Sequence, residues 1–144
     1  MKIKLLLSFL FVFVLIGNSF AQNKKNKKEP IHHLVFQLSS PDTAVYRALT
    51  RQISNVLNYW PTAQIEVVVH NKGVSFMRKD QSTFQPEIQS LKDKGVEFAV
   101  CENTLKQQKL SKDQILPQAR FVPVGIAELV LKQEDGWAYL KAGF

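Results

Sequence analysis

Five short apolar runs recur along the chain, and each is separated from the next by a segment with a different pattern. The runs are rich in β-branched and aromatic residues, which favour strands. They cover residues 31–38, 65–70, 96–101, 119–122 and 137–141. Because they are mostly apolar without alternation, they are typical of strands buried on both faces of a sheet.

The segment between the first two runs repeats apolar residues at intervals of three and four, which is the period of an amphipathic helix. The repeating residues are Val45, Leu49, Ile53, Val56 and Trp60. Ser40 is predicted to be the N-cap of this helix, with Pro41 at its first helical position. Pro61 is predicted to end the helix.

Helical patterns also fill the later gaps between the runs. One helix is predicted to begin at Pro86 and to stop at Gly95, and residues 103–109 are weakly helical. Residues 111–114 have the spacing of a capping box, and the last helix covers residues 124–134. Its inward-facing residues are predicted to be Ile126, Leu129 and Val130.

This alternation of strands and helices predicts an α/β fold in which a mostly parallel sheet is covered on both faces. Ligands bind such sheets at the carboxyl ends of the strands, where loops and helix N-termini converge. The candidates at this edge are Ser39, Ser40, Asp42, His70, Asn71, Lys72, Cys101, Glu102, Asn103, Pro123 and Gly125. His32 and His33 lie at the opposite edge and are interpreted as ordinary residues where a strand begins.

Several familiar α/β chemistries lack their motifs in this sequence. The glycine patterns of Rossmann and P-loop sites are missing, and no Ser lies in a G-x-S-x-G elbow. The loop after the first strand reads SSPD, which does not suit a flavin phosphate. A phosphoacceptor domain needs an Asp where Cys101 stands, and a rhodanese-type loop needs Arg and Gly donors after the Cys. Since these motifs are absent, Cys101 is the strongest remaining candidate for a reactive residue.

Cys101 ends a buried strand and opens a helical turn, so backbone N–H groups and the helix dipole can stabilise its thiolate. His70 can supply a positive charge or accept a proton if its strand neighbours that of Cys101. The adjacent Glu102 acts the other way, because a carboxylate disfavours a thiolate. The alternative is structural, since free Cys is often simply buried and a strand-end His often bonds a nearby carbonyl. Both interpretations stay open at this point.

The distribution of charged residues along the chain decides how the net charge is interpreted. The chain of 144 residues has a formal net charge of +7 and a single Cys, which excludes an internal disulfide and a multi-thiolate zinc site. Residues 30–144 carry 13 basic and 11 acidic residues. The basic excess therefore precedes the domain, and nucleic acid is not an expected partner.

Residues 1–21 have the three parts of a secretory signal peptide: two Lys, an apolar run and a small-x-small site ending at Ala21. The apolar run, 5–16, is shorter than the roughly 20 residues of a spanning helix. We therefore expect export to the periplasm or beyond, cleavage near Ala21 and no stable membrane anchor. The expected parts are a signal over 1–21, a flexible Lys/Asn-rich tether over 22–30 and a single domain over 31–144.

Three stretches together resemble the DsrE/DsrF-like family, and within it the exported, stand-alone members. They read IEVVVHNKGVSFM, GVEFAVCENTL and VPVGIAELVLKQEDGWAYLKAG, and the resemblance spans roughly residues 31–143. It implies a three-layer α/β/α fold with a parallel five-stranded sheet, assembled as trimers or hexamers. One departure is that Asn71 follows His70, where the family pattern has Gly.

Several cytoplasmic relatives in this family belong to sulfur-relay or dissimilatory sulfur systems, in which a Cys after the third strand carries sulfur as a persulfide. Cys101 matches that position, so the resemblance implies a sulfur carrier with Cys101 and His70 as catalytic residues. It implies no cofactor or metal, and a donor or acceptor protein as partner. The residues expected to bind the substrate are Asn71, Glu102, Asn103, Thr104 and Gly125.

A second hypothesis is a non-catalytic homo-oligomer whose clefts bind a small ligand or another exported protein. Residues 74–83 fit either a helical turn or a mobile loop, and a loop would expose Val74, Phe76 and Met77 as subunit contacts. Under this hypothesis Phe76→Asp abolishes function. A third hypothesis, a redox or haem-associated role, finds little support in a single Cys.

Overall fold

The computed structural model describes residues 30–143. The signal segment predicted for residues 1–21 lies outside the described residues, as does the predicted tether except for its last residue, Pro30. No helix within 30–143 is long and apolar enough to cross a membrane.

Five strands form one sheet in which every neighbouring pair is parallel. They are β1 (His33–Leu38), β2 (Gln64–Val69), β3 (Glu97–Cys101), β4 (Ala119–Val122) and β5 (Ala138–Lys141). Their order across the sheet is β4-β3-β2-β1-β5. Each apolar run predicted as a strand is confirmed, and the parallel arrangement extends to the whole sheet.

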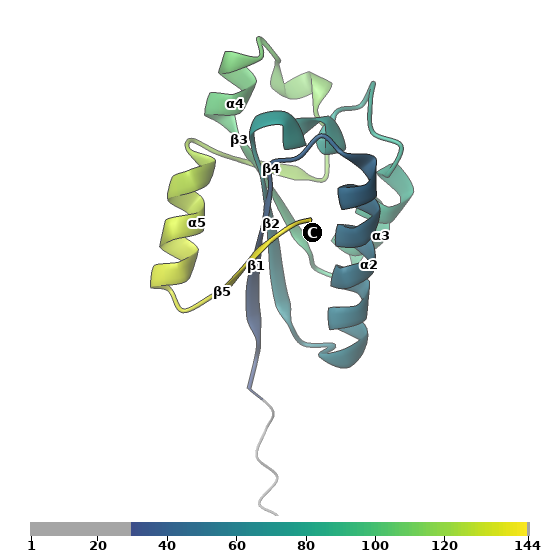
Figure 1. The fold of residues 1–144 in the computed structure, drawn as a ribbon, viewed down its shortest axis with the longest axis vertical. Helices are drawn as coiled ribbons and strands as arrows, with labels where there is room; N and C mark the ends of the chain where they lie inside the picture. Colours follow the sequence, from purple (N-terminus) through teal and green to yellow (C-terminus); the bar gives the residue numbers. More distant parts are fainter. Residues whose placement is uncertain (1–29, 144) are drawn as a thin grey trace, which may run out of the picture. The chain divides into compact units, whose positions relative to one another are not determined.

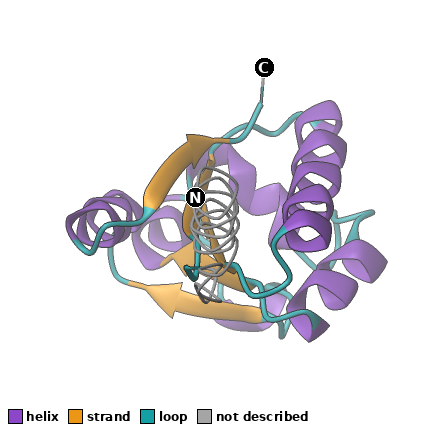
Figure 2. Cartoon of the chain, turned by 90° about the horizontal axis from the view of Figure 1, so that it is seen from below, coloured by secondary structure: helices purple, strands orange, loops and turns teal. Residues whose placement is uncertain are grey.

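Helices cover both faces of this sheet, as Figures 1 and 2 show. Helices α2 (Thr43–Tyr59) and α3 (Gln85–Asp93) lie side by side on one face, and α5 (Gly125–Glu134) covers the other. Two short elements, α4 (Glu102–Gln107) and the 3-10 helix η2 (Lys112–Gln114), lie between β3 and β4 in the chain. The predicted three-layer α/β/α architecture is confirmed.

The start of α2 differs from the prediction, because its N-cap is Asp42 and not Ser40. The Asp42 Oδ1 accepts the N–H of Ala44 at 2.8 Å. The Ser40 hydroxyl oxygen instead accepts the N–H of Asp42 at 3.1 Å. A carboxylate is a stronger acceptor than a hydroxyl and is favoured at the positive end of the helix dipole, which explains why the helix starts after Asp42.

The segment after β2 is an ordered 3-10 helix, η1 (Asn71–Met77). Val74, Phe76 and Met77 are fully buried in it, so the mobile loop that would expose them is a wrong expectation. The Phe76 ring packs against the rings of Tyr46, Phe84 and Phe98. A change of Phe76 to Asp would therefore place a charge in the core, and it would test folding and not association.

The rotation of α5 about its axis also differs from the prediction. Leu129 is buried as expected, but Ile126 and Val130 are 53% and 46% exposed. Glu128 and Lys132 turn toward the sheet instead, because they form ion pairs with charged side chains of β4 and β2. The face of α5 that meets the sheet therefore combines the apolar Leu129 with these ion-paired side chains.

Candidate functional site

A pocket of about 240 Å³ lies where β2 and β3 end and α5 begins. Because β2 pairs with β3 and β3 with β4, the residues that follow these strands are neighbours. The pocket is lined by His70, Asn71, Cys101, Asn103, Thr104, Gln107, Val124, Gly125 and Ile126. The structure thus brings six of the seven predicted site residues together, and the exception is Glu102.

Cys101 is one of the most buried residues of this group, with 5% of its surface exposed. Its Sγ accepts the backbone N–H of Gly125 at 3.2 Å. Burial raises the pKa of the Cys101 thiol, but hydrogen bonds from the N–H of Gly125, the N–H and hydroxyl of Thr104 and the N–H of Asn103 outweigh burial. The pKa of Cys101 therefore lies below its ordinary value, which favours the reactive thiolate.

Gly125 is the first residue of α5, so its N–H has no partner within the helix and is free for the sulfur. A β-carbon at this position would lie 3.1 Å from that of Cys101 and 3.3 Å from that of His70. The absence of a side chain therefore lets the N-terminus of α5 approach the sulfur. The same distances make Cys101 and His70 neighbours across Gly125.

His70 follows β2 directly and is half-buried. Its Nε2 lies 2.9 Å from the Nε2 of Gln37, and the hydroxyl of Tyr139 donates to the Oε1 of Gln37. Burial lowers the pKa of His70 below the ordinary value, so its ring is neutral at neutral pH. Sequence reasoning missed Gln37 and Tyr139. The only local signal was a polar Gln inside an apolar run, because its partners lie 33 and 102 residues away.

The turn after His70 explains the departure from the family pattern. Asn71 has a φ of +53°, the left-handed conformation that Gly adopts freely and that Asn tolerates better than most residues. Its N–H donates to the Thr104 hydroxyl oxygen at 2.9 Å, and its carbonyl accepts the side chain of Gln108 at 2.9 Å. Asn71 thus takes the place of Gly and ties the turn to α4.

Glu102 points away from the pocket. Its carboxylate pairs with Lys112 Nζ at 2.5 Å, outside the group that lines the pocket. The hydrogen bond from Lys112 lowers the pKa of Glu102. Because Lys112 partly neutralises the Glu102 carboxylate, this carboxylate destabilises the Cys101 thiolate less than its position next to Cys101 in the sequence would indicate.

The other predicted candidates also lie outside the pocket. The pocket lining does not include Ser39, Ser40, Asp42, Lys72 or Pro123. His32 and His33 lie beside the start of β1, where the His32 ring stacks on Trp60 with centroids 3.9 Å apart. Within residues 30–143 no three His, Cys, Asp or Glu side chains gather closely enough to hold a metal ion.

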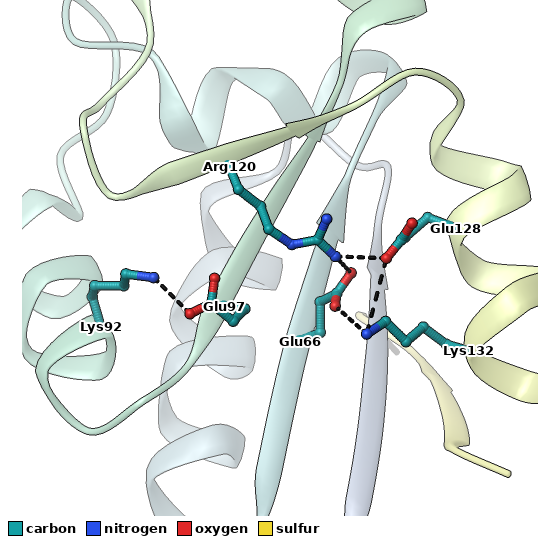
Figure 3. Close-up of polar contacts among 6 residues, drawn as sticks. All are labelled: Glu66, Lys92, Glu97, Arg120, Glu128 and Lys132. Carbon is teal, nitrogen blue, oxygen red and sulfur yellow. Dashed lines mark hydrogen bonds and ion pairs between the residues drawn. The ribbon is translucent and has the colours of Figure 1, made fainter. Parts of the chain in front are cut away.

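Helix α5 is held against the sheet by a cluster of four charged side chains (Figure 3). Glu66 of β2 is 2% exposed and pairs with Arg120 of β4 at 2.7 Å and with Lys132 of α5 at 3.0 Å. Glu128 of α5 also pairs with Arg120, at 2.5 Å. The cluster joins α5 to two strands, and in doing so it fixes the helix whose first N–H meets Cys101.

Comparisons with known proteins agree with this architecture. A protein of unknown function, MTH1491 from Methanobacterium thermoautotrophicum, is 29% identical with a TM-score of 0.74, over 76% of this chain and 98% of that one. A second protein of unknown function, BT1422 from Bacteroides thetaiotaomicron, is 16% identical with a TM-score of 0.59, over 76% of this chain and 93% of that one, and shares the fold. No curated protein matches the sequence.

The sequence profile of one family covers the described domain almost from end to end. It matches residues 32–142, a span that contains all five strands and every residue that lines the pocket. The chain belongs to the DsrE/DsrF-like family, which is associated with sulfur relay.

Proposed function

We propose that this protein carries sulfane sulfur as a persulfide on Cys101. The observation that supports this function is the contact between Cys101 Sγ and the N–H of Gly125, inside a pocket of hydrogen-bond donors. Donors aimed at the sulfur favour its charged form over the thiol. A persulfide at the same position is an anion too, so the same donors suit both states of the carrier.

The transfer consists of two displacements at sulfur. The Cys101 thiolate attacks the outer sulfur of a donor R–S–SH. A sulfur–sulfur bond forms to Cys101, the donor's sulfur–sulfur bond breaks, and R–S⁻ leaves with the bonding electron pair. An acceptor thiolate then attacks the outer sulfur of the Cys101 persulfide, forms its own persulfide and releases the Cys101 thiolate. Neither step has a net change in oxidation, so no further reductant or oxidant is needed.

The side chains that line the pocket suit a small sulfur group better than a ligand with several charges. Apart from the Cys101 thiolate itself, none of its lining side chains carries a formal charge at neutral pH, because His70 is neutral there. Asn103, Thr104 and Gln107 supply polar groups, and Val124 and Ile126 supply apolar surface at the rim. The outer sulfur is therefore held by hydrogen bonds and not by an ion pair.

Mass spectrometry of the intact protein and of its Cys101 peptide tests this function. The protein is incubated with inorganic polysulfide, freed of excess reagent and analysed without reductant. We expect one added sulfur atom on Cys101, and its loss when an acceptor thiol is supplied. Cys101→Ser is a clean control, because the chain has no other Cys. Recovery of Cys101 as free thiol only, under conditions that load a reference persulfide carrier, would contradict the proposal.

A second candidate function, a homo-oligomeric binding module, is favoured by the exposed apolar surface of α5 and β5. Leu131, at 55%, is the most exposed member of this set of apolar side chains. The set, here called the α5–β5 surface, consists of Val124, Ile126, Val130, Leu131, Tyr139 and Leu140. Exposed apolar side chains on a helix and the strand that follows it are typical of association surfaces. Because Val124 and Ile126 also line the pocket, association there would cover the rim of the Cys101 site.

A further inference from the structure

Three polar side chains on neighbouring strands form a hydrogen-bonded row that ends in the pocket. They are Tyr139 of β5, Gln37 of β1 and His70 after β2. β1 lies between β5 and β2 in the sheet, so the row runs across three adjacent strands (Figure 1). It brings together residues up to 102 positions apart in the chain.

All three side chains lie on the face of the sheet that α5 covers. Val35 packs in the same buried cluster as Leu129 of α5, and Gln37, two residues further along β1, points to the same side. Tyr139 is the register partner of Val35 and therefore shares this side. The row thus lies on the same side of the sheet as the helix that supplies the N–H of Gly125.

The orientation of the Gln37 amide indicates where the His70 proton lies. The Oε1 of Gln37 accepts the Tyr139 hydroxyl, and the amide nitrogen of Gln37 faces His70. An amide nitrogen has only hydrogens to offer, so the His70 Nε2 that lies 2.9 Å away must be the acceptor. In a neutral ring the proton is then on Nδ1.

We propose that Gln37 and Tyr139 are positioning residues that hold His70 in its Nδ1–H tautomer, so that His70 is a hydrogen-bond donor to sulfur and not a general base. With Nε2 occupied by Gln37, the ring has no free lone pair with which to take the thiol proton. That proton goes to solvent when the thiolate forms. The Nδ1–H is the remaining polar group of the ring for an anionic sulfur in the pocket that His70 lines.

This inference rests on the proposed function for its ligand, but the tautomer itself can be observed without any sulfur chemistry. The protein is labelled with ¹⁵N in its three His residues, and two-bond ¹H–¹⁵N correlation spectra are recorded at neutral pH. The His70 signals are identified by their loss in His70→Asn. We expect a protonated Nδ1 and an unprotonated Nε2 in the wild-type protein.

Two variants test the roles of Gln37 and Tyr139 separately. Gln37→Glu replaces the donor by a carboxylate that only accepts, so we expect the proton to move to Nε2. Tyr139→Phe removes the hydrogen-bond partner of the Gln37 Oε1, so we expect a mixture of tautomers. Tyr59→Phe is the matched control, because Tyr59 is 76% exposed on α2, and it should leave the His70 signals unchanged.

The result that overturns the inference is a wild-type His70 with its proton on Nε2, as a turned Gln37 amide would give, or with both nitrogens protonated. An unchanged tautomer in Gln37→Glu overturns it as well. The rate of persulfide loading on Cys101 is measured in parallel, and in Gln37→Glu it should fall by about tenfold, the effect of one hydrogen bond to a charged group. If Nδ1–H is found but no persulfide forms on the wild-type protein, the sulfur-carrier function fails and the tautomer assignment stands.

Discussion

At the scale of single residues, Thr104 connects two parts of the site. Its hydroxyl oxygen accepts the N–H of Asn71 at 2.9 Å, and its hydroxyl hydrogen bond is among those that lower the pKa of Cys101. One side chain therefore holds the left-handed turn after β2 and supports the thiolate at the end of β3. A hydroxyl can do both because it donates one hydrogen and accepts through its lone pairs.

We predict that Thr104→Val raises the pKa of Cys101 by about one unit, because a hydrogen bond to a charged group contributes about 1.5 kcal/mol. The measurement is the pH dependence of the rate of Cys101 alkylation, whose midpoint should move to higher pH. Thr104→Ser keeps the hydroxyl and should keep the wild-type midpoint. A Thr104→Val midpoint at or below the wild-type value would show that the hydroxyl does not support the thiolate.

The site residues that could be predicted from the sequence differ from those that could not in the kind of contact that places them. Cys101, Gly125 and His70 directly follow or precede apolar runs, and parallel topology places all such residues at one edge. Gln37 and Tyr139 act through side-chain hydrogen bonds between strands that are distant in the chain, and no local pattern encodes that contact. The local periodicity of the sequence therefore predicts which residues lie at the edge of the sheet, but it does not predict that Gln37 contacts the His70 ring there or that Tyr139 contacts Gln37.

At the scale of elements, the position of α5 in the chain depends on local sequence, whereas its rotation depends on contacts with distant residues. The helix itself was predictable from its length and its apolar content, and its bounds match the prediction to within one residue. Its rotation was not, because Glu128 and Lys132 turn inward to meet Arg120 and Glu66 on other elements. The sequence pattern treated Glu66, a buried residue of the middle strand, as part of an apolar run, yet Glu66 pairs with Lys132 on the face of α5 that meets the sheet.

We predict that Glu66→Gln lowers the free energy of unfolding by about 3 kcal/mol, because removing one charge of a buried cluster leaves Arg120 and Lys132 without their central partner. Urea denaturation measures this change. The matched control is Glu97→Gln, the neighbouring position on β3, whose pair with Lys92 is exposed and contributes about 1 kcal/mol or less (Figure 3). Equal losses in the two variants would contradict the role given to burial.

The same Glu66→Gln variant also has a consequence at the site. If the cluster holds the N-terminus of α5 in place, loosening it weakens the contact between the Gly125 N–H and Cys101 Sγ, and the alkylation midpoint of Cys101 should move to higher pH. Glu97→Gln should not move it. A destabilised Glu66→Gln protein with the wild-type midpoint would confine the cluster to a structural role.

At the scale of the whole molecule, four of the six residues of the α5–β5 surface lie on α5 or at its N-cap, and α5 covers the side of the sheet that carries the row. On β5, Tyr139 points to that side and Leu140 to the other. One hypothesis from the sequence placed subunit contacts at Val74, Phe76 and Met77, which instead form part of the core. The sequence pattern counted Ile126 and Val130 as core residues, and they are exposed. Apolar content alone does not distinguish core from interface, because both are apolar; the distinction depends on the contacts that each face makes in the folded chain.

We predict that the protein self-associates through the α5–β5 surface. Sedimentation velocity over a range of concentrations should give a species larger than the monomer, and Leu131→Asp, which places a charge at the 55% exposed Leu131, should return it to the monomer. Tyr59→Asp is the matched control, since it makes the same kind of change at an exposed aromatic residue of α2 and should leave the assembly intact. Leu131 does not line the pocket, so Leu131→Asp should also retain persulfide loading on Cys101, which separates assembly from sulfur chemistry. A wild-type protein that sediments as a monomer at every concentration would contradict the proposed association.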